Sequence, residues 1–355
     1  MTDVAARRLR AQRLTGEPFT TAVDAVRWLG AVQSQDYGGA KWALGLRTRG
    51  ATDAELDRLF DQGAILRTHV MRPTWHFVLP EDIRWLLELT GPRVRLGLAG
   101  RHRQLEIDEG VIARASSAFA SALSGGRCLT RSELGEVLRA AGISPEGQRL
   151  PHLLTSGELD GLLVSGPRRG KQFTYTLLEE RAARIRPLDR TEALIELTRR
   201  YFRSHGPAQL QDFVWWSGLT VAEARRGISL AEAELDHRVE LGREYWFAAE
   251  AGPDREAAAA SHLLPNFDEY TVGYRDRAAL LHPDRPFEPS LFSFGSILSN
   301  IVTVGGRVRG AWRRTAGGVE IRPLGALAAA ERASVEEAGC RLSRFLDRPL
   351  AVRWV

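Results

Sequence analysis

Two glutamines separated by one residue, Gln33 and Gln35, are the side chains with the clearest chemical use in this sequence. Glutamine neither titrates nor attacks, but two amides together can hold a water molecule or the edge of a base. In an extended segment residues two apart lie on one face, and Gly30 before the pair and Gly38-Gly39 after it indicate a helix end and a turn. We therefore predict an extended step that presents both amides to one point. Two surface glutamines that merely follow a helix are the open alternative.

The composition permits a nucleic-acid partner without requiring one. The 355 residues are enough for about two to four domains. The net charge is +5 and the pI about 9.6, and nearly all of the positive charge is arginine, since Lys41 and Lys171 are the only lysines. Arginine binds phosphate oxygens with two parallel hydrogen bonds, so this balance is compatible with DNA or RNA.

No pattern in the sequence predicts a metal site, a cofactor or a membrane segment. Cys128 and Cys340 are far apart, and neither CxxC nor HExxH spacing occurs. No apolar run approaches the length of about 18 residues that a transmembrane helix needs, and the N-terminus lacks the apolar core of a signal peptide. We expect a cytoplasmic protein that needs neither metal nor cofactor.

The first part of the chain follows the order of a winged helix-turn-helix. The patterns are helical over 4–14, 21–29 and 52–63, extended over 65–79 on both sides of Met71-Arg72-Pro73, and helical again over 80–103. Helices followed by a strand pair predict a first winged-helix unit in residues 1–105.

The second part repeats this order more clearly. Helical patterns cover 108–123, 130–140 and 147–157, and strand patterns cover 161–165 and 172–177. Thr130 and Glu133 form a capping-box pattern, and the basic segment Gly166–Lys171 joins the two strands as a hairpin tip. We predict a second winged-helix unit in residues 106–190 with a basic wing; an unrelated α+β domain with a basic hairpin is the alternative.

The last two parts are a third helix-turn-helix and a strand-rich domain. Residues 191–205, 209–217 and 220–227 are helical patterns and a hairpin follows over 239–247, which predicts a third unit in residues 191–255. Trp215-Trp216 could stack on bases, although such pairs are more often core residues. Residues 256–355 contain a glycine-turned hairpin, a further strand and a helix over 327–345. The pattern alone indicates nucleic-acid binding and does not indicate an enzyme.

At this point the chain resembles the bacterial winged-helix DNA glycosylases of the AlkZ-like family, with the YcaQ-like enzymes as a related branch. The motifs that carry the resemblance occur in the family's order and span nearly the whole chain. They are Val32-Gln33-Ser34-Gln35, Arg67–His76, His205-Gly206-Pro207 with Trp215–Leu219, Phe267–Tyr270 with Gly273–Arg277, and Gly306-Arg307-Val308 with Trp312-Arg313.

The resemblance implies an α+β fold of three tandem winged helix-turn-helix units plus a C-terminal β-barrel-like domain. It also implies a monofunctional glycosylase that hydrolyses the N-glycosidic bond of N7-alkylguanine, including bulky natural-product adducts or crosslinks. Gln33 and Gln35 match the two catalytic glutamines of the AlkZ branch; in the YcaQ branch the second position is aspartate. Ser34 departs from the usual aliphatic middle residue, and in an extended segment its side chain would point away from the site.

An N7-alkylguanine is already cationic, so the enzyme need only place a water molecule and favour positive charge on the sugar. We predict that Gln33 and Gln35 hold that water. Asp36 is a secondary catalytic candidate, as a base or as a charge that stabilises the cation, although by alternation it faces away from both glutamines. Candidates for DNA contact are basic residues of the wing and of the matching motifs. They are Arg67, His69, Arg72, Arg168, Arg169, Lys171, Arg275 and Arg277.

The competing function is a non-catalytic winged-helix DNA-binding protein, such as a transcription regulator, for which the glutamines would contact DNA only. Regulators commonly dimerise on two-fold operators, and the sequence shows no coiled coil or other dimerisation segment. We expect a monomer that binds double-stranded DNA containing alkylated guanine. No lysine is close to the glutamines in sequence except Lys41, so lyase chemistry through a Schiff base is not expected.

Overall fold

The computed structural model describes all residues except 1–3, 183–186, 241, 249–259 and 282–298. The described residues form two units. Unit 1 comprises residues 1–56, 195–216 and 220–355, and unit 2 comprises residues 57–194 and 217–219. This division is coarser than the four predicted domains, whose boundaries stay a prediction; the boundary after residue 255 falls among residues that are not described.

Unit 1 begins with the helices and the short strand that carry the paired glutamines. They are α1 (Val4–Ala11), α2 (Ala22–Leu29), β1 (Val32–Gln33) and α3 (Tyr37–Gly45), followed by α4 (Asp53–Asp61), which the division between the units crosses. The Thr21 hydroxyl caps α2 by accepting the Asp24 N–H at 3.1 Å, and Gly30 ends it with a φ of 82°. The predicted helix and its glycine stop are confirmed.

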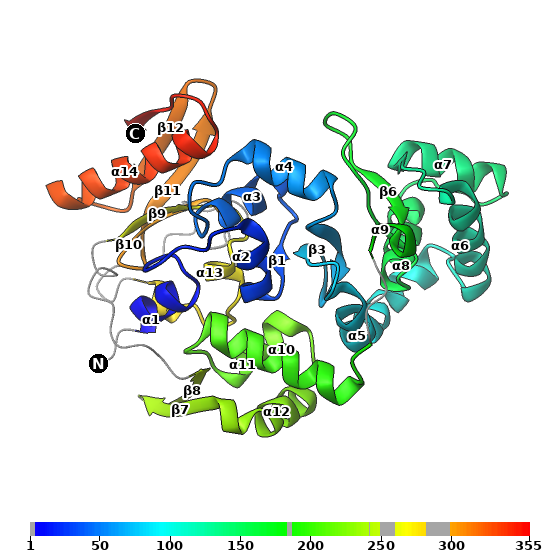
Figure 1. Ribbon diagram of the computed structural model, residues 1–355, viewed down its shortest axis with the longest axis horizontal. Helices are drawn as coiled ribbons and strands as arrows, with labels where there is room; N and C mark the ends of the chain where they lie inside the picture. Colours follow the sequence, from blue (N-terminus) through cyan, green and yellow to red (C-terminus); the bar gives the residue numbers. More distant parts are fainter. Residues whose placement is uncertain (1–3, 183–186, 241, 249–259, 282–298) are drawn as a thin grey trace. The chain divides into compact units, whose positions relative to one another are not determined.

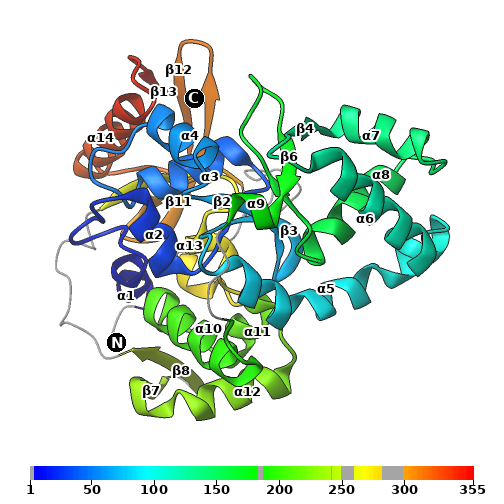
Figure 2. The ribbon, with the colours of Figure 1, turned by 45° about the vertical axis from the view of Figure 1, so that its right-hand side comes forward.

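The middle of unit 1 is helical and ends in a hairpin (Figures 1 and 2). Its elements are α10 (Arg190–His205), most of which belongs to unit 1, α11 (Leu210–Ser217), α12 (Val221–Leu230), β7 (Leu235–Glu240) and β8 (Arg243–Ala248). Thr220 and Glu223 form a capping box at the start of α12. Trp216 is fully buried, whereas Trp215 is 42% exposed, so Trp216 is a core residue and Trp215 is partly open to solvent.

The C-terminal part of unit 1 is an open five-stranded sheet with strand order β13-β12-β11-β10-β9. Its elements are β9 (Ser261–Leu264), α13 (Glu269–Val272), β10 (Ile301–Val304), β11 (Arg307–Thr315), β12 (Gly318–Pro323), α14 (Ala329–Phe345) and β13 (Ala351–Trp354). Strands β9 to β12 pair antiparallel, and β13 pairs parallel to β12.

The expected β-barrel-like domain is not found in the described residues, because β9 and β13 are the two edges of this sheet. Helix α14 packs along β9 and β13 (Figure 1) and buries Val335, Leu342 and Phe345. Helix α14 therefore covers the sheet and shields its apolar side chains from water. The sheet does not need to close into a barrel for this.

Unit 2 contains a strand pair, a small three-stranded sheet and a set of packed helices. Its elements are β2 (Leu66–Val70), β3 (Arg72–Val78), α5 (Ile83–Gln104), α6 (Glu109–Leu123), β4 (Leu129–Thr130), α7 (Arg131–Ala140), α8 (Arg149–Leu159), β5 (Leu163–Ser165), β6 (Thr174–Leu177) and α9 (Leu178–Arg181). The predicted strand pair around Met71 is confirmed, and Met71 joins β2 to β3 with a φ of 65°.

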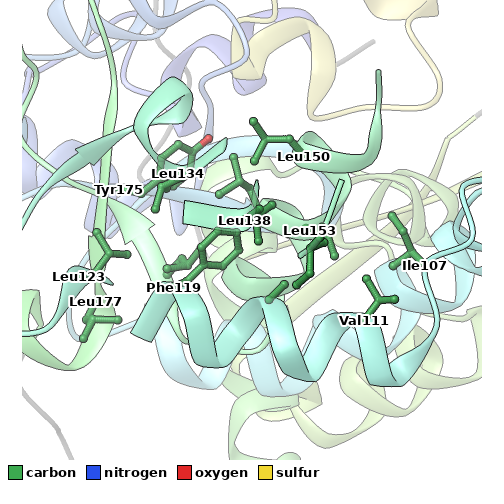
Figure 3. Close-up of a cluster of buried hydrophobic side chains, with 14 residues drawn as sticks. Ile107, Val111, Phe119, Leu123, Leu134, Leu138, Leu150, Leu153, Tyr175 and Leu177 are labelled. Atoms are coloured by element: carbon green, nitrogen blue, oxygen red, sulfur yellow. The ribbon is translucent and has the colours of Figure 1, made fainter. Parts of the chain in front are cut away.

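Helices α6, α7 and α8 share one apolar core with strand β6 (Figure 3). Phe119 and Leu123 come from α6, Leu138 from α7, Leu153 from α8 and Leu177 from β6, and all are buried. Strands β4, β6 and β5 pair antiparallel in that order. The predicted capping box at the start of α7 is present, so the helix and strand order predicted for this segment is confirmed. No helix in the described ranges is both long and apolar enough to cross a membrane.

Candidate functional site

The two glutamines lie between the end of α2 and the start of α3, in unit 1. Strand β1 ends at Gln33, which is only 7% exposed, and Gln35 is exposed in the bend that follows. The extended step that we predicted is therefore short. The Gln33 side chain is held within the protein, whereas the Gln35 amide is open to solvent.

The prediction of a chain turn at Gly38-Gly39 is wrong, because both glycines belong to the first turn of α3. Asp36 caps this helix: its Oδ1 accepts the Gly39 N–H at 3.0 Å. A Cβ on Gly39 would lie 3.0 Å from Asp36 Oδ2 and 3.3 Å from Pro265, so a larger residue there would crowd the cap. The Asp36 carboxylate thus has a structural task that explains its position after the glutamines.

A buried carboxylate lies directly behind Gln33. Glu269 is fully buried, and its Oε1 accepts the backbone N–H of Gln33 at 2.8 Å. Its Oε2 accepts the Trp216 indole N–H at 2.9 Å, and His205 Nε2 lies 3.3 Å from the same oxygen. Both partners are themselves fully buried. Three donors from distant parts of unit 1 therefore converge on one carboxylate.

The ring of His205 is fixed by further contacts. It stacks on Tyr201 with 4.8 Å between ring centroids and an interplanar angle of 13°, and its Nδ1 lies 2.7 Å from the Ser204 hydroxyl oxygen. Burial lowers the pKa of His205 below its usual 6.5, against the opposing effect of Glu269. In the tautomer with Nε2–H, neutral His205 donates to Glu269.

The backbone around Glu269 is held as firmly as its side chain. Gln12 donates from Nε2 to the Glu269 carbonyl at 3.1 Å. The preceding residue, Asp268, forms a fully buried bidentate pair with Arg47, with contacts of 2.8 and 2.9 Å. Such paired, planar contacts fix orientation as well as charge. The carboxylate behind Gln33 is therefore part of a rigid cluster.

The sequence alone gave no role to Glu269 or His205. Both lie inside motifs that carried the family resemblance, Phe267–Tyr270 and His205-Gly206-Pro207, but nothing in their local spacing indicates that they meet. One signal could have indicated them: Glu269 and His205 are ionisable residues in segments whose other residues are typical of a buried core.

Two of the predicted DNA-contact residues are buried in unit 2. Arg67 is 4% exposed, and its guanidinium lies 4.3 Å from the Trp75 ring centroid and 4.5 Å from that of Phe173. His69 forms a hydrogen bond with the fully buried Glu158. These contacts are structural, and contact of Arg67 or His69 with DNA stays a prediction.

A third residue from that segment, Arg72, is half-buried in β3, and its Nη2 lies 3.5 Å from His76 Nε2. In the predicted wing of unit 2, Arg168 pairs with Asp57 at 3.2 Å and Arg169 pairs with Glu133 at 2.8 Å. Lys171 is exposed beside them.

The two predicted residues of unit 1 differ in exposure. Arg275 is exposed and donates to the Gln211 amide oxygen at 3.1 Å. Arg277 is half-buried, donates to the Thr271 carbonyl at 2.9 Å and lies over the exposed Trp215. Arg169, Lys171 and Arg275 are thus the predicted contacts with open side chains.

The described residues contain no group of three or more His, Cys, Asp or Glu side chains that could hold a metal ion. A metal-free reaction stays a prediction.

Comparisons with known proteins agree with one another. A family model described as "DNA glycosylase AlkZ-like" matches residues 26–345. A protein of Streptomyces sahachiroi described as "Interstrand DNA cross-link repair glycosylase" is 26% identical over 335 residues, which are 85% of this chain and 85% of that protein. The solved structure of the Streptomyces sahachiroi DNA glycosylase AlkZ matches with a TM-score of 0.82 at 22% identity, over 100% of this chain and 99% of that chain. This last likeness shows a shared α+β fold.

Proposed function

The chain belongs to the AlkZ-like DNA glycosylase family, and from this premise we propose that it hydrolyses the N-glycosidic bond of N7-alkylguanine in double-stranded DNA. Membership in an enzyme family decides against the non-catalytic regulator that the sequence had left open. The observation that carries the proposal is the pair Gln33 and Gln35, one held within a buried network and the other open to solvent.

The chemistry that this arrangement suits is water addition to a cationic nucleotide. An N7-alkylated guanine departs as a neutral base when the bond between its N9 and the sugar C1′ breaks, and it takes the bonding electrons with it. The water oxygen bonds to C1′, and the proton that the water loses goes to solvent. Gln33 and Gln35 hold the water by their amides, so the protein contributes position and oriented dipoles.

Asp36 ranks behind the glutamines as a catalytic group. Its carboxylate accepts the Gly39 N–H and lies 3.4 Å from the Asn266 amide nitrogen, which ties it to the start of α3. A general base has to reach the water with a free oxygen. The cap uses Oδ1 for the helix and the Asn266 amide donates to Oδ2, so we assign Asp36 to placing the segment.

The relative described as an interstrand cross-link repair glycosylase supports a proposal for the substrate range. This chain acts in the same way on bulky or crosslinked N7-guanine adducts and so serves DNA repair or self-resistance against natural alkylating toxins. Residues 106–190 are a winged helix whose tip carries Arg169 and Lys171, and these residues with Arg275 contact DNA phosphates. Their exposed side chains support this assignment.

The first test is release of 7-methylguanine from alkylated duplex DNA, in EDTA, by the wild type, Gln33→Ala and Gln35→Ala. We expect release by the wild type and a loss of about 100-fold in the single-turnover rate of each variant, the size of effect seen when one aligned dipole is removed from a polar transition state. Binding to undamaged duplex, measured in parallel, serves as the control and should stay close to that of the wild type.

Each outcome of this test has a distinct meaning. Unchanged release in both variants would move the site away from the glutamines and make Asp36 the next candidate. Release that stops in EDTA would contradict the metal-free mechanism. Absence of release by the wild type, for methylated DNA and for a duplex with a bulky or crosslinked N7-guanine adduct alike, would contradict the proposed substrate.

A further inference from the structure

We propose that Glu269 is a positioning residue of this site, which fixes Gln33 through its backbone and is itself oriented by Trp216 and His205. This inference rests on the proposed function, since it assumes that Gln33 acts on the water. It assigns a task to a fully buried acidic side chain that the hydrolysis itself does not use.

Glu269 acts on Gln33 through one hydrogen bond. The Gln33 N–H is buried and would be costly to leave without an acceptor. Its acceptor is a carboxylate oxygen at 2.8 Å rather than a peptide carbonyl, and a charged acceptor makes the stronger bond. The position of the Gln33 backbone determines where its side-chain amide lies. A fixed backbone N–H therefore also fixes the side-chain NH2 group and oxygen that face the water.

The second oxygen of the carboxylate determines its orientation. Oε2 accepts the Trp216 N–H at 2.9 Å and lies 3.3 Å from His205 Nε2, so rotation of the carboxylate would break these contacts. The peptide of Glu269 is also held, by Gln12 and by the pair of Asp268 with Arg47. Oε1 is therefore presented to Gln33 in one geometry, as a preorganised site requires.

Glu269 acts only through Gln33, because it is fully buried and does not reach a solvent-borne substrate. This separates it from Asp36, which lies at the start of an exposed helix turn. A positioning role predicts a slower chemical step with unchanged DNA affinity. A role in folding alone predicts a less stable protein whose folded fraction reacts normally.

The decisive variant is Glu269→Gln, which keeps the shape of the side chain. Its amide has one acceptor oxygen and one NH2 group, whereas the site has an N–H of Gln33 on one side and an N–H of Trp216 on the other. One of these donors must then face the NH2 group. We expect single-turnover release of 7-methylguanine to slow about tenfold, which equals about 1.4 kcal/mol, with the Kd for duplex DNA changed less than about twofold.

A rescue variant tests the hydrogen-bond argument itself. Trp216→Phe removes the competing indole N–H and keeps a ring against Tyr201, whose centroid lies 5.0 Å from that of Trp216. Neutral His205, which faces the same oxygen, can take the Nδ1–H tautomer and accept from the amide NH2 group through Nε2. In the double variant Glu269→Gln with Trp216→Phe, the amide oxygen is free to face Gln33. We expect the double variant to react faster than Glu269→Gln alone, although Trp216→Phe by itself slows the wild type by about twofold to threefold.

A matched control separates this effect from the general loss of a buried carboxylate. Asp82 of unit 2 is also buried and accepts an indole N–H, from Trp85 at 3.0 Å. Asp82→Asn should leave the rate of release by folded protein unchanged. Circular dichroism at the assay temperature gives the folded fraction of every variant.

The inference is overturned if Glu269→Gln releases 7-methylguanine at the wild-type rate, or if the double variant is no faster than Glu269→Gln. Should Glu269→Gln fail to fold, Trp216→Phe decides: slower release at unchanged Kd supports the inference, and an unchanged rate overturns it. Failure of the proposed function is a separate result, because the wild type would then release no alkylated base.

Discussion

At the scale of single residues, several side chains in this protein gain their properties from burial. His262 in β9 is an example outside the candidate site. Burial, aided by the positive charge of Arg341, lowers the pKa of His262 from 6.5 to about 3, and its Nε2–H donates to the Leu14 carbonyl at 2.8 Å. Neutral His262 is thus part of the folded state, and the unfolded chain binds a proton that the folded chain does not.

The pH dependence of stability follows from this difference. The folded pKa is depressed, so the contribution of His262 is fully present above the unfolded pKa of about 6.5 and is lost as the pH falls toward 3, by about 1 kcal/mol per pH unit. His262→Gln keeps a donor for Leu14 but cannot titrate. Between about pH 7 and 5.5 we expect urea unfolding to show a smaller loss of free energy in His262→Gln than in the wild type, by about 1 kcal/mol.

The comparison requires both proteins to unfold in one transition, and His205, which is also buried, should leave part of the pH dependence in place. Equal pH dependence of the two proteins would show that His262 does not titrate as inferred.

At the scale of elements, the ends of α2 and α3 determine the positions of Gln33 and Gln35. Gly30 closes α2 three residues before Gln33, and Asp36 opens α3 immediately after Gln35. The segment between them has few residues, so a change in either cap moves the glutamines. The caps therefore belong to the function of the site as well as to its stability.

Substitutions at Asp36 distinguish a cap from a catalytic carboxylate. Asn caps helices as well as Asp does, but it carries no charge and cannot act as a base. We expect Asp36→Asn to release 7-methylguanine at close to the wild-type rate. Asp36→Ala should lose about 1 kcal/mol of unfolding free energy and some of the rate as well. A strong loss of rate in Asp36→Asn, with stability retained, would instead identify Asp36 as a catalytic group.

At the scale of the whole molecule, the net charge of +5 does not show which cations can reach DNA. Several arginines already form ion pairs within the protein. Arg8 and Arg47 form buried ion pairs, and Arg168 and Arg169 are paired at the predicted wing. The exposed Lys171 at the same hairpin is one of the cations most open to a phosphate. DNA affinity should therefore depend on a small number of contacts rather than on net charge.

The salt dependence of DNA binding tests this assignment. Lys171→Ala should weaken binding to duplexes of any sequence about equally, and should flatten the slope of log K against log salt by roughly one unit. Arg139→Ala is the matched control in unit 2, because Arg139 is exposed but pairs with Glu136 and Glu146. A slope that is unchanged in Lys171→Ala would remove this residue from the DNA interface.

The sequence by itself determined the local features of this protein, because their signals lie within a few residues of one another. A glycine stop, a helical pattern and a capping box placed α2, α6 and α7, in that order, close to their observed bounds. Turn residues placed the strand pair around Met71. The spacing of Gln33 and Gln35, with motifs in a family's order, was sufficient to indicate a DNA glycosylase, which the family match supports.

The tertiary structure alone decided which side chains meet. Gln33 and Glu269 are 236 residues apart in sequence, and only the packing of unit 1 brings that carboxylate, His205 and Trp216 together. The burial of Arg67 between two rings and the open sheet with α14 as its cover were also not predictable from sequence. Burial and long-range pairing depend on the combined packing of segments that are distant in sequence, and no local pattern records them.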